Sequence, residues 1–476
     1  MTTPDDWVTA AAFRNLRSAK HQSIRSSTCR RLFRPQALLL AISLMWCGLI
    51  DPCAAQDPST RASVVAAMQP FDGKPATGPA NSTLAGKVLC GYQGWFAAEG
   101  DGSGRGWRHY GARGQFQPGA CAIDLWPDLA EFDDDEKFPT AFRHADGRVA
   151  AVFSSTRRKT VLRHFQWMHD YQIDGVFVQR FAVETRHPRD LWQCNTVLAH
   201  CREGANLHNR GYAVMYDLSG LPEGGTQVVI DDWKLLVDRM HLGKDPRDFA
   251  YLHHGGKPVV AVWGVGFNDG RKYALEECER LIDFLRHDPQ YGGFAVMLGV
   301  PTGWRTLDAD SLRDPALLRV VAEADIVSPW SVGRYARPEQ VPAHAEHRWK
   351  PDIDWCRAHQ QEYLPVVFPG FSWHNMRPNS PLDQISRQGG KFLWAQLTAA
   401  HQAGASMIYV AMFDEMDEGT AIFKCTGDPP AGDSRFVTFD GLPSDHYLWL
   451  TGQGGALLRG VIRPTPEPPV RRNAAR

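Results

Sequence analysis

Residues 175–181 read GVFVQRF, a short apolar run that ends in polar side chains, and runs of this kind decide the fold. From the second run to the eighth their starts lie 31 to 46 residues apart, and amphipathic stretches with helical spacing separate most of them. This alternation predicts an all-parallel sheet of the α/β class, and eight units predict a closed (β/α)8 TIM barrel. The eight runs are residues 88–93, 175–181, 212–218, 258–264, 294–300, 325–330, 363–368 and 406–413.

An open, doubly wound sheet is the alternative for the same alternation. Such sheets usually carry a glycine-rich phosphate turn after the first strand. Residues 91–95 read GYQGW, with glycines three apart and an aromatic residue after the second, which does not match G-x-G-x-x-G. We therefore predict the barrel, as a single catalytic domain with a long insertion between residues 94 and 157. An insertion after the first strand lies at the end of a barrel where active sites are built.

Composition excludes one class of partner. The chain has 476 residues, of which 43% are hydrophobic, and this allows one large barrel or two to three smaller domains. Its 52 Lys and Arg residues against 53 Asp and Glu residues give a net charge of -1. Because nucleic-acid binding usually requires a basic surplus, we expect no nucleic-acid partner. We also expect a monomer.

The first 55 residues have the pattern of an export signal. Residues 37–50 are apolar but too short for a bilayer span, which needs about 20 residues. Basic residues precede this run and Cys53-Ala54-Ala55 follows it, so we predict cleavage before Gln56. Arg30-Arg31-Leu32-Phe33 also matches the core of a twin-arginine signal, and the export route stays open. The mature chain should have no membrane span and should be periplasmic or secreted.

The rest of the chain divides by composition. Residues 56–86 are rich in Pro, Ala, Ser and Gly without periodicity, which predicts a linker. The barrel domain should occupy residues 87–460, and residues 461–476 should form a disordered tail. The seven cysteines left after cleavage fit no zinc-binding spacing, and we predict no metal and no other cofactor.

Polar and aromatic side chains follow the predicted strands. The carboxyl ends of barrel strands surround the active site, so these side chains should meet there. Aromatic rings among carboxylates suit a carbohydrate, because sugars present apolar C–H faces and dense hydroxyl groups. The candidate substrate-binding residues are Tyr92, Gln93, Trp95, Trp126, Arg180, Tyr216, Asp217, Trp263, Trp330, Trp373 and His374.

Some of these candidates have a structural alternative. Arg180 could pair with a carboxylate at the end of the barrel instead of contacting a substrate. Trp263 and Trp330 end apolar runs, so packing in the core is an equal alternative to stacking on a sugar. Tyr92 follows Gly91, which lets a ligand approach the backbone.

The eighth run ends in the highest concentration of acidic side chains in the chain. Residues 413–420 read FDEMDEGT, with four carboxylates in five residues. Like charges this close favour keeping one group protonated, which supplies the acid and the base of glycoside cleavage. A solvated acidic turn and a calcium site are the alternatives. The place of the cluster at the end of the last strand favours catalysis.

Several stretches carry a family resemblance. Residues 415–422, EMDEGTAI, resemble the E-x-x-E-G-T-x-I motif of glycoside hydrolase family 99, the endo-α-mannosidases. Residues 91–96 (GYQGWF), 124–128 (DLWPD) and 174–181 (DGVFVQRF) resemble secreted bacterial proteins grouped as family 71/99-like. The similarity extends from about residue 87 to about residue 450, so the domain at residues 87–460 is expected to be a glycoside hydrolase-like barrel.

The resemblance implies catalytic roles for two glutamates. Glu415 would act as a base on the substrate 2-hydroxyl group and form a 1,2-anhydro sugar. Glu418 would protonate the leaving oxygen and later activate water, which gives retention without a metal. The chain departs from family 99 at Met416, where Trp is usual, and at Phe423-Lys424, where Glu-Pro is usual. The α-1,3-glucanases of family 71 look similar in keeping an acidic pair at the same strand, and they invert.

The expected function is therefore that of a secreted, endo-acting glycoside hydrolase that cleaves an α-linked glycan, with an α-mannan-like substrate favoured. Its partner would be a poly- or oligosaccharide. An inverting α-1,3-glucanase-like hydrolase and a non-catalytic carbohydrate-binding barrel are the alternatives.

Overall fold

The computed structural model describes residues 60–77, 81–377 and 379–471. The predicted export segment, residues 1–55, lies outside the described residues. Within the described ranges, none of the helices combines the length and the apolar character that crossing a bilayer requires.

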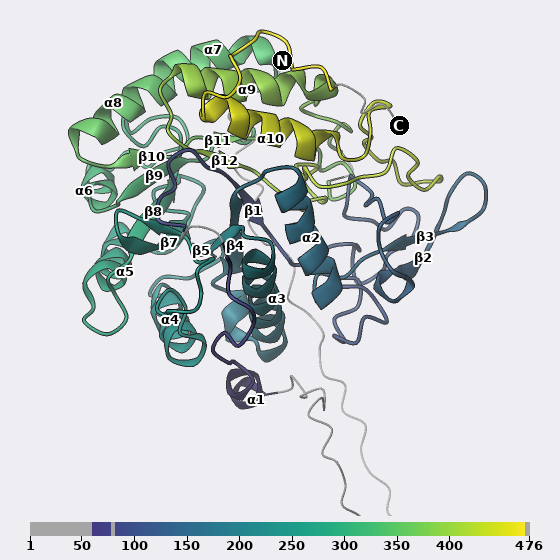
Figure 1. Cartoon of the computed structure of the whole chain (residues 1–476), viewed down its shortest axis with the longest axis horizontal. Coiled ribbons are helices and arrows are strands. Elements are labelled where there is room, and N and C mark those ends of the chain that lie inside the picture. Colours follow the sequence, from purple (N-terminus) through teal and green to yellow (C-terminus); the bar gives the residue numbers. More distant parts are fainter. Residues whose placement is uncertain (1–59, 78–80, 378, 472–476) are drawn as a thin grey trace, which may run out of the picture.

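A parallel sheet closed into an eight-stranded barrel forms the centre of the molecule (Figure 1). Its order is β10-β9-β8-β7-β5-β4-β1-β12-β11, and all eight predicted runs contribute to it. The prediction of a (β/α)8 fold is confirmed. The strands are β1 (Val88–Tyr92), β4 (Gly175–Phe181), β5 (Gly211–Asp217), β7 (Lys257–Trp263), β8 (Ala295–Val300), β9 (Ile326–Pro329), β10 (Glu362–Tyr363), β11 (Val366–Val367) and β12 (Ile408–Val410).

The barrel closes through its seventh strand, which is split into β10 and β11. The first part pairs with β9 and the second with β12, each over two residue pairs, whereas β4 and β5 pair over seven. Leu364 and Pro365 connect the two parts. The Leu364 amide donates to Val327 O at 2.9 Å, and Pro365 O accepts from the Tyr409 amide at 3.0 Å. One strand therefore contacts both neighbours, although its proline has no amide to donate.

Helices surround the barrel because its strands are apolar on both faces and need an outer cover (Figure 1). On α2, for example, Val161, Phe165 and Met168 are buried on one face. The α-helices around the barrel are α2 (Arg158–Asp170), α3 (Pro188–Leu207), α4 (Gln227–Met240), α5 (Leu275–His287), α6 (Ala316–Ala322), α7 (Val341–His344), α8 (Lys350–Ala358), α9 (Lys391–Gln402) and α10 (His446–Leu458). Shorter turns are η2 (Asp134–Glu136), η3 (Glu184–Arg186), η4 (Pro338–Gln340), η5 (Ala345–Trp349) and η6 (Gln388–Gly390).

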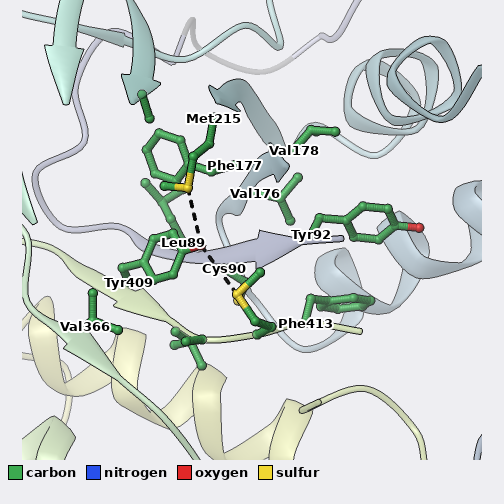
Figure 2. Close-up of a cluster of buried hydrophobic side chains, with 14 of the residues drawn as sticks. Leu89, Cys90, Tyr92, Val176, Phe177, Val178, Met215, Val366, Tyr409 and Phe413 are labelled. Carbon is green, nitrogen blue, oxygen red and sulfur yellow. Dashed lines mark hydrogen bonds between the residues drawn. The ribbon is translucent and has the colours of Figure 1, made fainter. Parts of the chain in front are cut away.

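Side chains alternate between the barrel interior and the helices. Figure 2 shows Leu89, Phe177, Met215 and Tyr409 gathered together, while Tyr92 points away from them at the end of β1. The interior is full at this level, since a Cβ on the glycine that precedes Tyr92 would lie 2.2 Å from the Tyr409 hydroxyl oxygen. Any open space must therefore lie above this layer, at the strand ends.

The insertion after β1 is a folded subdomain at one side of the barrel (Figure 1). It contains an antiparallel hairpin, β2 (Phe138–Arg143) and β3 (Val149–Val152), that the sequence analysis did not predict. Asp124 ties it to the C-terminal part of the chain, because its amide donates to Met416 O at 2.9 Å. A further short strand, β6 (His253–His254), pairs antiparallel with β7.

Both segments that flank the barrel domain differ from the prediction where the structure describes them. Residues 60–77 and 81–86, expected to be a linker, include helix α1 (Arg61–Ala66) and bury four apolar side chains. These are Val64, Met68, Phe71 and Leu84. The composition concealed them because such anchors are spaced too widely to give a periodic pattern.

Residues 461–471, expected to belong to a disordered tail, also contact the domain. Trp394 Nε1 donates to Thr465 O at 2.9 Å, and the Arg471 guanidinium binds both carboxylate oxygens of Asp445. One indole, one bidentate ion pair and the partly buried Ile462 therefore hold this segment against the domain.

Candidate active site

An open cavity of about 430 Å³ lies at the carboxyl ends of the barrel strands. Most of the predicted site residues line it, as expected for a barrel. These are Gln93, Trp95, Asp217, Trp263, Trp330, Trp373, Glu415 and Glu418.

Tyr92, Arg180 and Tyr216 do not line the cavity, and their assignment to substrate binding is wrong. Each precedes or follows an inward residue on its strand and so points outward, because strand side chains alternate between the two faces. Arg180 is buried and binds Asp232 through Nε at 2.6 Å. The Tyr216 hydroxyl group donates to the same carboxylate at 2.6 Å, and the Tyr92 hydroxyl group contacts His164 Nδ1 at 2.9 Å. These three residues join the barrel to its helices.

Trp126 and His374 are also structural. The Trp126 ring is buried inside the insertion, stacks against Phe116 and donates from Nε1 to Ala151 O at 3.1 Å. The His374 amide donates to Asp124 Oδ2 at 2.6 Å, and its ring Nδ1 lies 2.6 Å from Ser380 O. Contacts with backbone oxygen atoms, of Ala151 in β3 for Trp126 and of Ser380 for His374, orient these side chains.

Glu415 is held at the end of β12 by two hydrogen bonds. Gln93 Nε2 donates to Oε1 at 2.6 Å, and the Thr420 hydroxyl group donates to Oε2 at 2.6 Å. The side chain is 4% exposed. Burial, together with the charges of Glu418 and Asp417, raises its pKa well above the usual value. Both oxygens thus have a fixed position facing the cavity.

Glu418 lies one turn further along the same loop and is partly exposed to the cavity. Its backbone oxygen accepts from the Ser372 amide at 2.9 Å. The next residue, Gly419, has φ of 61°, and a Cβ there would lie 2.8 Å from the same amide nitrogen, so the turn requires glycine. Burial raises the pKa of Glu418 to about 8, and the charge of Asp417 adds to this. This raised pKa favours the protonated form of Glu418 at neutral pH.

Asp414, the first carboxylate of the motif, has a structural role. It is fully buried and accepts from the amides of Gln93 at 2.7 Å and Gly94 at 2.9 Å. These bonds fix the end of β1 beside the end of β12. Asp414 does not line the cavity with Asp417, and this separates the two aspartates that a calcium site in the motif would use.

One acidic cluster in the described part of the chain has the spacing to share a metal ion, and it lies on η2 rather than in the motif. Its members are Asp133, Asp135 and Glu136. Lys159 Nζ already contacts Asp133 at 3.2 Å and Asp135 at 3.0 Å. A lysine ammonium group therefore occupies the place where a cation would bind.

Three tryptophans form an aromatic wall beside Glu418. Trp263 and Trp330 meet edge to face with ring centroids 5.4 Å apart, and Trp373 completes the wall. The Nε1 atoms of Trp263 and Trp373 have no hydrogen-bond partner among the described residues. A smaller cavity of about 90 Å³ continues between these rings and Glu418. Such a wall offers apolar ring faces, which suits the C–H faces of a sugar.

The cavity also contains residues that the sequence analysis missed. Arg108 and His109 come from the insertion, Phe181 from β4, and Arg377 from the loop after β11. The remaining unpredicted lining residues are Gly111, Ala122, Glu184, Ser219, Met376 and Met412. Gln179, a polar residue at the end of β4, and Asp417 of the acidic motif also line the cavity, and the sequence had already marked both. Alternation along β4 is a signal that could have identified Phe181, whereas no local pattern marks Arg108 or His109.

Part of this chain, including the motif, is similar in sequence to a known protein family. The sequence model of Glycosyl hydrolase family 99 matches residues 334–456, which include the motif. Glycoprotein endo-alpha-1,2-mannosidase of Rattus norvegicus is 28% identical over 106 residues, or 22% of this chain and 22% of that protein. The same enzyme of Mus musculus is 27% identical over 106 residues, with the same coverage of 22%. The chain thus spans about a fifth of the length of these curated relatives.

The similarity in fold extends further than the similarity in sequence. The GH99 endo-alpha-mannosidase from Bacteroides thetaiotaomicron superimposes with a TM-score of 0.58 at 18% identity, over 79% of this chain and 99% of that chain. This match shows a shared barrel fold. Together with the family model, it confirms the resemblance to family 99.

Proposed function

We propose that this protein is a glycoside hydrolase of the family 99 type, with Glu415 and Glu418 as its catalytic pair. The observation that carries the proposal is that both glutamates of the family motif line one cavity at the end of β12. A non-catalytic carbohydrate-binding barrel would have no need to bury two neighbouring carboxyl groups, because burying them is costly unless they are used.

The two carboxyl groups have different environments, and this supports different roles. Each donor bond to a carboxylate stabilises its ionised form, and Glu415 accepts two, from Gln93 and Thr420. We therefore assign the negative charge of the pair to Glu415 and the proton to Glu418. An ionised base and a protonated acid are what the reaction requires.

The proposed reaction proceeds in two steps. Glu415 takes the proton of the substrate 2-hydroxyl group, and the freed oxygen attacks the anomeric carbon while Glu418 gives its proton to the leaving oxygen. A 1,2-anhydro sugar results. In the second step the Glu418 carboxylate takes a proton from water, the water oxygen attacks the same carbon, and Glu415 returns its proton to O2. Two inversions give net retention.

We propose an α-mannan-like glycan as the substrate and endo cleavage as the mode. The named activity of the rat and mouse relatives supports this choice, as does the smaller cavity that continues past Glu418. The departures at Met416 and Phe423 keep an inverting α-1,3-glucanase-like reaction as the second candidate. We further propose export to the periplasm or the medium, as a monomer, on the pattern of residues 1–55.

Product stereochemistry is the test of the proposed reaction. The purified protein is incubated with yeast α-mannan and, in parallel, with an α-1,3-glucan, and proton NMR follows the first-formed reducing ends. The retained anomer from the mannan is expected, and Glu418→Gln serves as the inactive control. The inverted anomer, or cleavage of a 2-deoxy substrate, would exclude the anhydro-sugar mechanism. Binding of the glycan without cleavage would favour the carbohydrate-binding barrel.

A further inference from the structure

Asp417 is a third acidic group of the motif at the cavity, and neither glutamate role accounts for it. Its side chain is 2% exposed and lines the same cavity as the two glutamates. Oδ2 lies 3.0 Å from His109 Nδ1. Oδ1 is buried and has no hydrogen-bond partner among the described residues. A buried carboxyl group with one unsatisfied oxygen is costly, so its presence in a cavity calls for a function.

His109 is a fixed partner for Asp417. It belongs to the insertion, its backbone has φ of 61°, and its ring stacks on Trp95 with centroids 3.9 Å apart and planes 4° apart. Trp95 in turn packs against Phe181 of β4. The ring therefore has one orientation, and its Nδ1 faces the carboxyl group.

The pair holds its hydrogen in one of two ways. Burial, reinforced by Arg108, lowers the pKa of His109 to about 3, so the ring is neutral. Burial, reinforced by the charge of Asp124, raises the pKa of Asp417 to about 8. Below this pH the carboxyl group donates to Nδ1, and the ring carries its hydrogen on Nε2. Above it, the carboxylate must accept from Nδ1–H, so ionisation of Asp417 requires the other tautomer of His109.

Other charged groups also face this part of the cavity. Asp217 at the end of β5 and Arg377 in the loop after β11 act on Glu418 in opposite directions. On the insertion side, Arg108 is paired with Glu184 at 2.5 Å. Among these charges, Asp417 has the largest effect on the pKa of Glu418, after burial itself.

We propose that Asp417, anchored by His109, is a positioning residue that keeps the proton of the catalytic acid on Glu418. This inference rests on the proposed function. It states, however, that the charge of Asp417 affects the pKa of Glu418, and this effect is measurable without any substrate.

The first experiment measures the coupling by pH-dependent unfolding in urea, at pH 5 to pH 8. A carboxyl group whose pKa is raised on folding makes the unfolding equilibrium constant rise about tenfold for each pH unit in this window, because the unfolded chain ionises first. In the wild-type background, Glu418→Gln should remove the contribution of one carboxyl group to the rise of the unfolding equilibrium constant with pH. When Asp417→Asn is already present, Glu418→Gln should reduce this rise clearly less. Additive effects of the two substitutions would overturn the proposal.

The second experiment observes His109 directly. Long-range proton–nitrogen spectra of protein labelled with 15N-histidine should show a neutral ring whose hydrogen moves from Nε2 to Nδ1 as the pH rises through about 8. In Asp417→Asn the side-chain amide donates to Nδ1 at every pH, so no exchange of tautomers is expected. A doubly protonated ring at pH 6 would contradict the inference.

The third experiment uses turnover of yeast α-mannan. In Asp417→Asn the alkaline limb of kcat should move to lower pH by about one unit, because removing a nearby negative charge lowers the pKa of Glu418. Asp231→Asn, an exposed aspartate on α4, is the matched control and should show no movement. An unmoved limb in Asp417→Asn would overturn the inference. Wild-type protein without turnover, but with coupled unfolding, would instead overturn the proposed function alone.

Discussion

The cavity has two walls that are built differently. In the strand-end wall, polar groups bond to one another, as Gln93 does to Glu415 and Gln179 to Tyr409. In the loop wall, rings are held by stacking, as His109 is on Trp95, and polar atoms such as Trp373 Nε1 lack a partner among the described residues. The strand-end wall therefore orients the groups proposed to react, and the loop wall presents aromatic rings to a ligand.

The largest effect should come from the strand-end wall. Glu415→Gln and Glu418→Gln each keep the shape of the side chain but remove its acid–base function, so kcat should fall by at least about 10³-fold. Affinity for the glycan, measured by calorimetry with the inactive proteins, should be nearly unchanged. Unchanged turnover in both variants would show that this wall does not carry the chemistry.

A pair of neighbours on β4 tests the alternation that builds this wall. Arg180→Met leaves Asp232 buried without its cation and should lower the free energy of unfolding by about 3–5 kcal/mol. Gln179→Ala, the adjacent inward residue, should cost much less stability and should weaken glycan binding instead. Urea unfolding and calorimetry measure the two effects. Weak glycan binding by a fully stable Arg180→Met protein would reverse the assignment.

Acidity of the strand-end wall should set the alkaline limit of activity. Glu418 must be protonated to act as the acid, and its pKa is raised to about 8. Turnover should therefore persist at neutral pH and fall about tenfold for each pH unit above 8. The kcat profile between pH 6 and pH 10 measures this. A fall that begins below pH 6 would show that another group supplies the proton.

Removing one ring from the loop wall should affect binding more than chemistry. Trp373→Ala should weaken glycan affinity by about 1–2 kcal/mol and leave kcat within a few-fold of wild type, because stacking is lost while the acid and base remain. Trp126→Phe, a buried tryptophan of the insertion, is the matched control and should leave affinity unchanged. Equal losses in both variants would mean that the effect is one of folding.

Chelation should have the smallest effect. Both motif glutamates must stay free for proton transfer, and Asp414 is already bonded to two backbone amides. Activity after dialysis against EDTA should equal that of untreated protein. Loss of activity that calcium restores would assign the motif to metal binding.

The strands were predictable because barrel strands are apolar on both faces and end in polar residues, as residues 175–181 do. Because both faces of these strands are apolar, the sequence does not show which of two adjacent side chains faces the cavity. Gln179 and Arg180 were equal candidates from the sequence, and the parity of the strand in the barrel decides between them. The hairpin of β2 and β3 was missed because Pro139 lies within β2, and a proline in a short run argues against a strand in the sequence.

The loop wall was less predictable for another reason. Trp373 and Trp95 could be proposed because they follow strand ends closely in sequence. His109 comes from the middle of the insertion, and what marks it is a stack on Trp95 and a bond to Asp417 that exist only after folding. Contacts between segments about 300 residues apart leave no local pattern in the chain.

The split seventh strand has a consequence for where the barrel opens locally. Two residue pairs on each side hold β10 and β11 in place, and Pro365 interrupts the ladder between them, whereas β4 and β5 share seven pairs. We expect the barrel wall to loosen first along this strand, so that the amides of Leu364 and Tyr409 exchange with deuterium before those in the middle of β5. Because β12, which leads into the motif, borders the same seam, such opening would widen the entrance to the cavity without disturbing the opposite side.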